Sequence, residues 1–232
     1  MAKKYAGVVL DYGHGGMIDG VYQTPGSKQY KFTDHDGFWI GEGVTNRKTA
    51  AYLIQYCLDA GIRVWDSVAK TEWDFAPHWM ELEQSNTSLA SRVEYANGPE
   101  PRFGILLSIH SNAIGSSIEG PSLSVRGVSM FTSVGQTASD TIADSLYESF
   151  SRIVGNDLRI RSGNWEDGDQ DHEANFYMLR KTFSPAVCGE VGFFTNIDDA
   201  RFLDSEVGQQ KIARAYLEGV LPFLETAPKT CS

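Results

Sequence analysis

Ser108-Ile109-His110-Ser111-Asn112-Ala113 is the stretch that decides the fold, because it ends an apolar run that begins at Phe103. Apolar residues bounded by Pro101 and by a small polar cluster are typical of a strand buried on both faces, as in a parallel sheet. In open parallel sheets the ligand crevice lies beyond the carboxyl ends of the strands. His110 therefore stands where chemistry is expected, although a lone histidine at this position often only caps its strand.

A second histidine occupies the same kind of position near the N-terminus. Residues 6–11 predict a first strand, and the turn Gly13-His14-Gly15-Gly16 follows it. Glycines let the backbone bend sharply and approach a ligand closely. The sequence thus places His14 and His110 at the same edge of one sheet.

Residues 17–41 are polar, aromatic and glycine-rich, which predicts a long loop, and such loops are usually functional. A helical period begins at Glu42 and stops at Gly61. Counting back along its apolar stripe in steps of four gives Asn46 and then Glu42. Both polar side chains therefore point toward the protein interior, where a charge needs a partner such as a cation. The strand over residues 62–65 completes a parallel βαβ unit.

The rest of the chain continues the alternation of helices and strands. Residues 73–85 predict a surface insertion rich in aromatic residues, and Ser88 caps a helix carrying Arg92, which either reaches the crevice or is solvated. Pro185 opens another buried strand that ends at Glu190, a third reactive group at the same edge. Further strands, helices and loops are predicted over residues 127–132, 142–154, 159–173, 176–179 and 213–224.

These segments predict a single α/β domain over residues 1–226, with a flexible tail over residues 227–232. Its sheet should be twisted, mostly parallel and about six strands wide, with helices on both faces.

Composition narrows the classes of protein that the chain can represent. Hydrophobic residues make up 41% and charged residues 22%, and no apolar run is long enough to cross a membrane. A formal net charge of -10 argues against an extended nucleic-acid interface. The N-terminus lacks a signal-peptide pattern, so we expect synthesis in the cytoplasm, and we expect a monomer. Cys57, Cys188 and Cys231 lack metal-ligand spacing and predict two buried thiols and a tail residue.

Four side chains then converge on one sheet edge: His14, Glu42, His110 and Glu190. Two imidazoles and one carboxylate make a ligand set for one Zn²⁺, with a fourth position open for water. Zinc lowers the pKa of bound water to about 7 and polarises a carbonyl. Glu190 would then take the proton from the water and pass it to a leaving amine. The alternative is that Glu190 only pairs with Arg180.

Several stretches also occur in a recognisable order: residues 9–16, Glu42 with Asn46, residues 89–97, 108–113 and 185–196, and the C-terminal helix. In order and spacing they resemble the zinc-dependent N-acetylmuramoyl-L-alanine amidases of the amidase 3 class. The resemblance implies zinc ligands at His14, Glu42 and His110, and a catalytic acid/base at Glu190. It implies a hydrolase that cuts peptidoglycan at the amide between the lactyl group of N-acetylmuramic acid and L-alanine.

The chain departs from that pattern in places. Tyr12 replaces a proline, and Cys188-Gly189 stand where aliphatic residues are usual. The segments 17–41 and 73–85 are longer than expected, and they either shape a glycan-peptide groove or pack locally. With no separate wall-binding domain expected, the pattern fits a bacteriolytic phage endolysin, released to the cell wall by host lysis machinery, or a bacterial or prophage enzyme acting in the periplasm or outside the cell.

Two other functions stay open: a zinc peptidase or carboxypeptidase acting within the stem peptide, and a non-catalytic module that binds cell wall. Other residues also have two interpretations. His35 is either a third metal ligand in place of Glu42 or solvated, and His172 is a second metal site, a substrate contact or neither. His78 is expected at the surface. Asn112 is either a substrate contact or a turn residue, so Asn112, Arg92 and His172 are the candidate substrate-binding residues.

Overall fold

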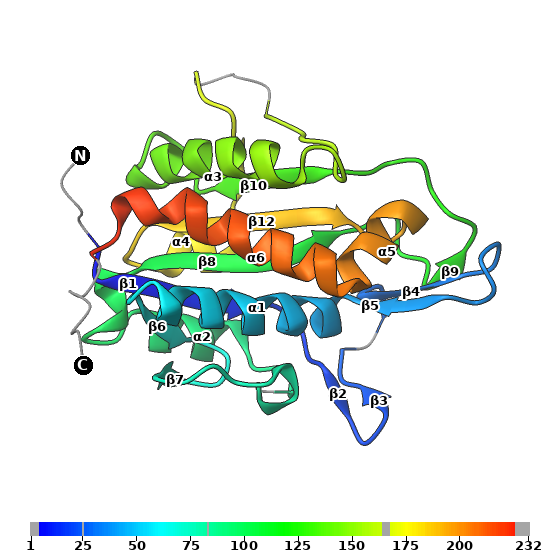
Figure 1. Ribbon diagram of the computed structural model, residues 1–232, viewed down its shortest axis with the longest axis horizontal. Coiled ribbons are helices and arrows are strands. Elements are labelled where there is room, and N and C mark those ends of the chain that lie inside the picture. The colour runs from blue at the N-terminus through cyan, green and yellow to red at the C-terminus, as the bar shows by residue number, and fades with distance from the viewer. Residues whose placement is uncertain (1–4, 25, 83, 164–167, 226–232) are drawn as a thin grey trace.

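A seven-stranded sheet forms the centre of the computed structural model, which describes residues 5–24, 26–82, 84–163 and 168–225 (Figure 1). Its strands, in the order β11-β10-β12-β8-β1-β6-β7, are β11 (His172–Glu173), β10 (Val128–Thr132), β12 (Ala186–Phe193), β8 (Ile105–Asn112), β1 (Gly7–Tyr12), β6 (Arg63–Asp66) and β7 (Thr71–Trp73). The four strands β12, β8, β1 and β6 are mutually parallel. Strand β7 runs antiparallel to β6 and β10 runs antiparallel to β12, while β11 is parallel to β10, so the four parallel strands form the centre of the sheet.

Helices cover both faces of this sheet, as the alternating sequence predicts (Figure 1). One face carries α1 (Glu42–Asp59), α3 (Ala138–Val154) and α6 (Glu206–Val220), with α5 (Ile197–Asp204) packed beside α6. The other face carries the shorter α2 (Leu89–Ala96) and α4 (Tyr177–Lys181). Val8 and Leu10 pack into the larger core while Val9 packs into the smaller one, because successive side chains on a strand point to opposite faces.

The same alternation decides where the polar residues of the strands lie. Ser108 and His110 share a strand face with Leu106, which belongs to the smaller core under α2 and α4. Glu190 is paired in register with His110 across the two central strands. The reactive groups therefore gather on the α2/α4 face, near the carboxyl ends of the parallel strands.

The segment 17–41 is more ordered than the predicted loop. It forms the hairpin β2 (Met17–Ile18) with β3 (Val21–Tyr22), and the hairpin β4 (Gln29–Phe32) with β5 (Trp39–Gly41). Strand β9 (Glu119–Gly120) then pairs with β4. Both hairpins turn at Asp-Gly dipeptides, Asp19-Gly20 and Asp36-Gly37, in which both residues have positive φ. Asp-Gly is a strong hairpin signal, so this order could be found in the sequence.

The ends of the helices follow their capping residues. Ser88 accepts a hydrogen bond from the Ser91 amide at the start of α2, as predicted. Asn196 caps α5 by accepting from the Asp198 and Asp199 amides. The closing helix was expected to run to residue 224, but α6 ends at Val220 and the 3-10 turn Leu221–Phe223 follows, since Pro222 cannot continue the helical hydrogen bonding.

Tyr12 and Gly189, two departures from the pattern that the sequence resembles, are accommodated by packing. Tyr12 is fully buried, and its hydroxyl donates to Asp66 Oδ2 at 2.5 Å. At Gly189 an added Cβ would lie 2.0 Å from the Tyr216 hydroxyl oxygen, so only glycine fits beside α6. Cys57 and Cys188 are buried free thiols, as expected, whereas Cys231 and the predicted tail, residues 227–232, lie outside the described residues. None of the described helices is long and apolar enough to cross a membrane.

Candidate metal centre

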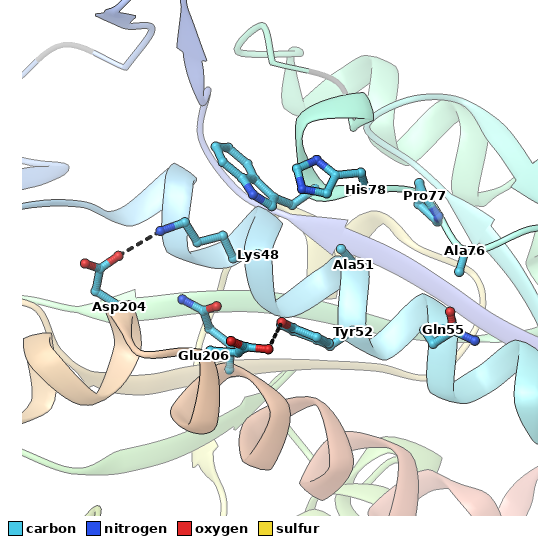
Figure 2. Close-up of a pocket in the computed structure, with 11 residues that line it drawn as sticks. Lys48, Ala51, Tyr52, Gln55, Ala76, Pro77, His78, Asp204 and Glu206 are labelled. Atoms are coloured by element: carbon cyan, nitrogen blue, oxygen red, sulfur yellow. Dashed lines mark hydrogen bonds and ion pairs between the residues drawn. The ribbon is translucent and has the colours of Figure 1, made fainter.

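A wide pocket of about 590 Å³ lies between α1 and α6, beside the 3-10 turn Trp79–Glu81 in the predicted insertion (Figure 2). Its polar groups satisfy one another: Lys48 Nζ lies 2.9 Å from Asp204 Oδ1, and the Tyr52 hydroxyl donates to Glu206 Oε1 at 3.1 Å. His78 is exposed at its rim, as expected, and its Nδ1 accepts from the Met80 amide. This pocket brings together no reactive set.

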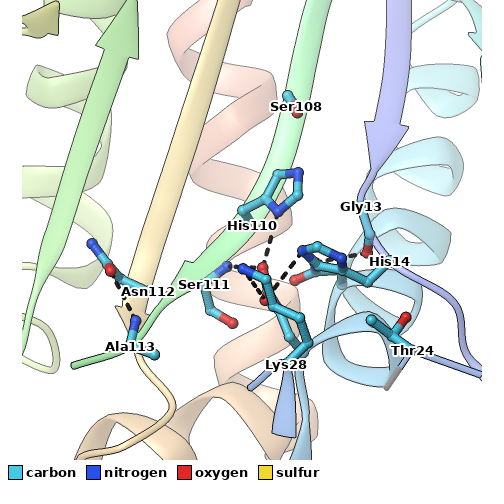
Figure 3. A network of polar contacts seen from close by, with 12 residues as sticks. Gly13, His14, Thr24, Lys28, Ser108, His110, Ser111, Asn112 and Ala113 are labelled. Carbon is cyan, nitrogen blue, oxygen red and sulfur yellow. Dashed lines mark hydrogen bonds and ion pairs between the residues drawn. The ribbon is translucent and has the colours of Figure 1, made fainter. Parts of the chain in front are cut away.

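A smaller pocket of about 240 Å³ lies at the sheet edge where the sequence places its reactive groups. Its polar side is lined by His14, Lys28, His110 and Glu190, and its apolar side by residues of the smaller core and α4. Figure 3 shows the two imidazole rings and the Lys28 side chain converging there. The ring centroids of His14 and His110 are 5.1 Å apart, with the planes nearly perpendicular.

The backbone around His14 is shaped to bring the two rings together. A Cβ on Gly13 would lie 1.8 Å from His110 Cε1, so the chain passes directly against that ring. His14 itself has φ 67, a left-handed conformation that costs a non-glycine residue energy. Arg47, buried on α1, holds this turn by donating from Nη1 to the His14 carbonyl at 2.7 Å.

Glu42, the first residue of α1, is completely buried between the two histidines. Its Oε1 accepts from His110 Nδ1 at 2.9 Å, while its Oε2 lies 3.3 Å from His14 Nε2 and 3.3 Å from Lys28 Nζ. The helix can start this close to the turn because the next residue is glycine: a Cβ on Gly43 would lie 2.0 Å from the carbonyl oxygen of Gly15.

Two atoms of this cluster have no hydrogen bond although they are buried: His14 Nε2 and Glu42 Oε2. Buried polar atoms in native proteins nearly always have a partner. His14, Glu42 and His110 each offer one ligand atom, and these atoms lie within 4.8 Å of one another. Two ring nitrogens and a carboxylate oxygen facing a common point are a donor set that suits a zinc ion. The three residues therefore fit a metal ion.

The electrostatics of the cluster favour cation binding at Glu42 and His14, whereas at His110 the hydrogen bond and charge of Glu42 outweigh burial and raise the pKa, so that a metal ion has to displace a proton from that ring. Burial would raise the pKa of Glu42, but the hydrogen bond from His110 and the charges of His110, His14 and Lys28 lower it to about 2. Burial and, to a smaller extent, the charge of His110 lower the pKa of His14 to about 4, although the charge of Glu42 acts in the opposite direction. Carboxylate and neutral imidazole are the protonation states that a metal ion binds.

Glu190 lies beside this cluster without being part of it. Its Oε2 is buried and has no hydrogen-bond partner, and burial raises the pKa of its carboxyl group to about 7. Arg180 is exposed and forms no ion pair with Glu190 in the part of the chain that the structure describes. The structure thus does not contain the predicted alternative, in which Arg180 neutralises this carboxylate.

Arg92 is buried, so the prediction of a solvated side chain is wrong, while a contact with substrate stays a prediction. Arg92 is 5% exposed, and its Nη1 donates to Asp11 Oδ1 at 2.7 Å. Ser108 Oγ donates to the other oxygen of that carboxylate at 2.6 Å. The three side chains form a buried layer that links β1, β8 and α2 under the reactive groups.

The other predicted residues lie apart from the cluster. Asn112 Oδ1 accepts from the Ala113 amide at 2.8 Å, which is the local turn role. His172 Nε2 lies 3.2 Å from the Arg161 carbonyl oxygen, and its ring stacks on Phe131. His35 Nε2 is 3.8 Å from Asp34 Oδ2, and the group that could hold a metal ion contains Glu42 rather than His35.

Sequence reasoning missed Lys28, Arg47 and Asp11. Lys28 lies in a segment without period, so nothing in the sequence indicated that its ammonium group reaches Glu42. Arg47 follows Asn46 on α1, and Asp11 precedes the glycine turn, so both stood next to residues that the pattern already marked. Polar residues at expected core positions of a strand or helix were the signal for both.

Comparison with known proteins identifies the family of this chain. A family model described as N-acetylmuramoyl-L-alanine amidase matches residues 8–221. An uncharacterized cell wall amidase of Bacillus anthracis is 26% identical over 220 residues, which is 94% of this chain and 35% of that protein. The N-acetylmuramoyl-L-alanine amidase CwlM of Bacillus licheniformis is 32% identical over 134 residues, 57% of this chain and 45% of that protein. The chain thus spans less than half the length of these curated relatives.

Solved structures share its fold. The catalytic domain of the amidase CwlV from Bacillus (Paenibacillus) polymyxa superposes with a TM-score of 0.66 at 21% identity, covering 93% of this chain and 96% of that one. The amidase Ami1 of Mycobacterium smegmatis gives a TM-score of 0.66 at 21% identity over 96% of this chain and 98% of the other. The catalytic domain of the CD27L endolysin, which targets Clostridia difficile, gives 0.58 at 16% identity over 96% and 100%.

Proposed function

Since this chain belongs to the N-acetylmuramoyl-L-alanine amidase family known as Amidase_3, we propose that it hydrolyses peptidoglycan at the amide between N-acetylmuramic acid and L-alanine of the stem peptide. The observation that carries the proposal is the group of the buried Glu42 with the half-buried His14 and His110, and Glu190 next to it in one pocket. A metal-binding group alone would fit many proteins. A metal-binding group with a free carboxylate beside it fits a hydrolase.

One Zn²⁺ would be held by His14, Glu42 and His110. When bound, zinc supplies a Lewis acid that polarises the scissile carbonyl and lowers the pKa of a water molecule. His14 Nε2 and Glu42 Oε2, which are buried 3.3 Å apart and make no hydrogen bond, support this assignment, because a cation between them would satisfy both.

Glu190 would carry the proton during hydrolysis. The reaction forms a bond between the water oxygen and the carbonyl carbon and breaks the bond from that carbon to the amide nitrogen. The carboxylate of Glu190 accepts the proton that the water loses and delivers it to the departing amine of L-alanine. Its buried position supports this role, since a carboxyl group whose pKa lies at about 7 can both accept and donate a proton near neutral pH.

The surroundings of Glu190 would bind the substrate chain. Met178 and Leu179 of α4 form the apolar wall of the pocket, and Phe176 lies at its exposed end. An apolar wall opposite a polar metal site excludes water from the reacting amide. Contacts to substrate by Asn112 and His172 stay predictions.

The test is Glu190→Gln, measured by the loss of turbidity of isolated cell walls and by metal analysis of the purified protein. We expect lytic activity to fall by at least about a hundredfold while zinc content and melting temperature are retained, because glutamine keeps the shape but cannot accept the proton. Glu173→Gln, an exposed glutamate on β11, is the matched control and should keep full activity. Equal activity of Glu190→Gln and wild type would refute the role.

Mass spectrometry of the digested walls separates the three candidate functions. Free lactyl ends on muramic acid support the amidase. New peptide ends within the stem would identify a peptidase instead, and wall binding without any cleavage would identify a binding module. We further propose that the protein acts on the cell wall as a monomer and as an endolysin. Sedimentation would test the monomeric state, and lysis of intact cells from outside would test the endolysin role.

A further inference from the structure

Lys28 is the only lysine or arginine among the described residues that line the proposed catalytic pocket (Figure 3). Its ammonium group lies 3.3 Å from Glu42 Oε2, while 39% of its side chain is exposed. Glu190 lines the same pocket but forms no ion pair with Lys28 in the described part of the chain. A positive charge therefore stands at the open side of the pocket, next to the residues that would hold the metal ion.

Tyr22 and the first turn of α1 fix the backbone of Lys28. Its carbonyl oxygen accepts from the Glu42 amide at 3.0 Å and from the Tyr22 hydroxyl at 2.9 Å. The Tyr22 oxygen in turn accepts from the Gly43 amide at 2.9 Å. The base of the lysine side chain is thus attached to the metal centre, while its flexible four-carbon stem lets the ammonium group swing toward a ligand.

The contact with Glu42 does not explain Lys28 by itself. Glu42 is completely buried and belongs to the group that could hold a metal ion. An ammonium group beside a metal ligand repels the metal ion, so this pair weakens the metal site instead of completing it. With a cation at Glu42, the ammonium group needs another anion, and a substrate in the open side of the pocket can supply one.

We propose that Lys28 binds a carboxylate of the stem peptide, carried by the residue that follows L-alanine. This inference rests on the proposed function. That residue is a glutamate joined through its side chain, so its α-carboxyl group is either a free carboxylate or, where it has been amidated, a neutral amide. One residue of extended chain spans about 3.3–3.6 Å. An ammonium group 3.3 Å from a metal-ligand oxygen is therefore within reach of a carboxylate one residue beyond the amide that is cut.

A lysine distinguishes these two forms of the stem by their charge. Its ammonium group has three donors and no acceptor, and hydrogen bonds to a carboxylate are about twice as strong as those between neutral groups. Glu190 and the net charge of -10 disfavour an anionic substrate. Lys28 offsets this repulsion where the stem peptide enters, so it would select stems that carry the free carboxylate.

The test compares two fragments of peptidoglycan, in which N-acetylmuramic acid carries L-alanyl-glutamate with the α-carboxyl group either free or amidated. We expect the zinc-saturated wild type to cleave the free acid with a KM at least about fivefold lower and a similar kcat. Lys28→Met should bring the ratio of the two KM values to about one, while Lys28→Arg should keep the preference. Any effect of Lys28→Met on zinc or on Glu190 cancels in that ratio.

Lys31→Met, which changes an exposed lysine on β4, is the matched control and should keep the wild-type ratio. Calorimetric titration of Glu190→Gln with both fragments measures binding without cleavage. It should show the same preference for the free acid, and the preference should shrink at high salt, because a partly exposed ion pair is screened. Adding Lys28→Met to Glu190→Gln should make the two affinities equal.

The outcomes separate this inference from the proposed function. Equal KM values and equal affinities for the two fragments, or a preference for the free acid that persists in Lys28→Met, would overturn the role of Lys28 and leave the amidase activity standing. Failure of the wild type to cut cell walls at the lactyl amide would overturn the proposed function itself.

Discussion

At the scale of single residues, the candidate metal centre depends on a few side chains. Of these, Lys28 is the one that sequence reasoning could not find. The two histidines and Glu42 could be predicted because they follow strands or open a helix with a clear period. Lys28 reaches the site only because the paired strands of the segment 17–41 bring it there, and that pairing depends on contacts distant in sequence. The pairing of short strands depends on how their side chains pack against other parts of the protein, and the local sequence pattern does not indicate this packing.

We predict that Lys28→Met tightens zinc binding. The Lys28 ammonium group lies 3.3 Å from Glu42 Oε2, so it competes with a cation for that oxygen and repels it. Loss of one positive charge at this distance should lower the zinc dissociation constant about tenfold, measured by competition with a chromophoric chelator. Lys31→Met, an exposed lysine on β4, is the control. Unchanged zinc affinity in Lys28→Met would show that its ammonium group does not oppose the metal.

At the scale of secondary-structure elements, the buried side chains Arg92, Asp11 and Ser108 hold α2 against the sheet. The period of α2 and its cap could be predicted from the sequence, but the direction of Arg92 could not, because an arginine on such a helix is usually solvated. Its partner Asp11 is completely buried on β1, and that partner is visible only once strand and helix are packed together.

We predict that Arg92→Met destabilises the fold by about 3–5 kcal/mol, because it leaves the Asp11 carboxylate buried and unpaired. Urea unfolding of the zinc-loaded protein measures the free energy of unfolding. The double variant Asp11→Asn with Arg92→Met should recover part of the loss, since it removes the isolated charge. Arg214→Met, which breaks an exposed pair with Glu218, serves as the control and should cost less than about 1 kcal/mol. A loss of similar size in both single variants would contradict this account.

For the molecule as a whole, the order of the central strands and the long helices could be predicted, whereas the short strands β2 to β5, β7, β9 and β11 were missed. Alternating apolar runs and capped helices indicate α/β architecture, and buried central strands indicate a parallel sheet. The antiparallel directions of β7, a short edge strand, and of β10, which lies between β11 and β12, could not be predicted, because the sequence of a strand carries no signal for its direction. The boundary between α5 and α6 was also missed, although Ser205 caps the second helix.

We predict that the metal ion contributes to the stability of the entire domain. His14, Glu42 and His110 join β1, α1 and β8, so a bound ion links three elements. Zinc at about a thousand times its dissociation constant should stabilise the fold by about 4 kcal/mol, and EDTA should remove that gain in a thermal unfolding experiment. Glu190→Gln should respond as the wild type does. His14→Ala should melt at the same temperature with and without zinc, and a zinc shift in that variant would argue against His14 as a ligand.

The central sheet ends on both sides in very short strands, since β11 has two residues and β7 has three. A long edge strand exposes unpaired amide and carbonyl groups, and another protein chain can pair with them as an additional strand. In this sheet the two edge strands, β7 and β11, expose little backbone for such pairing, and the long strands all lie inside the sheet. Partly unfolded molecules should therefore be slow to assemble edge to edge at high protein concentration.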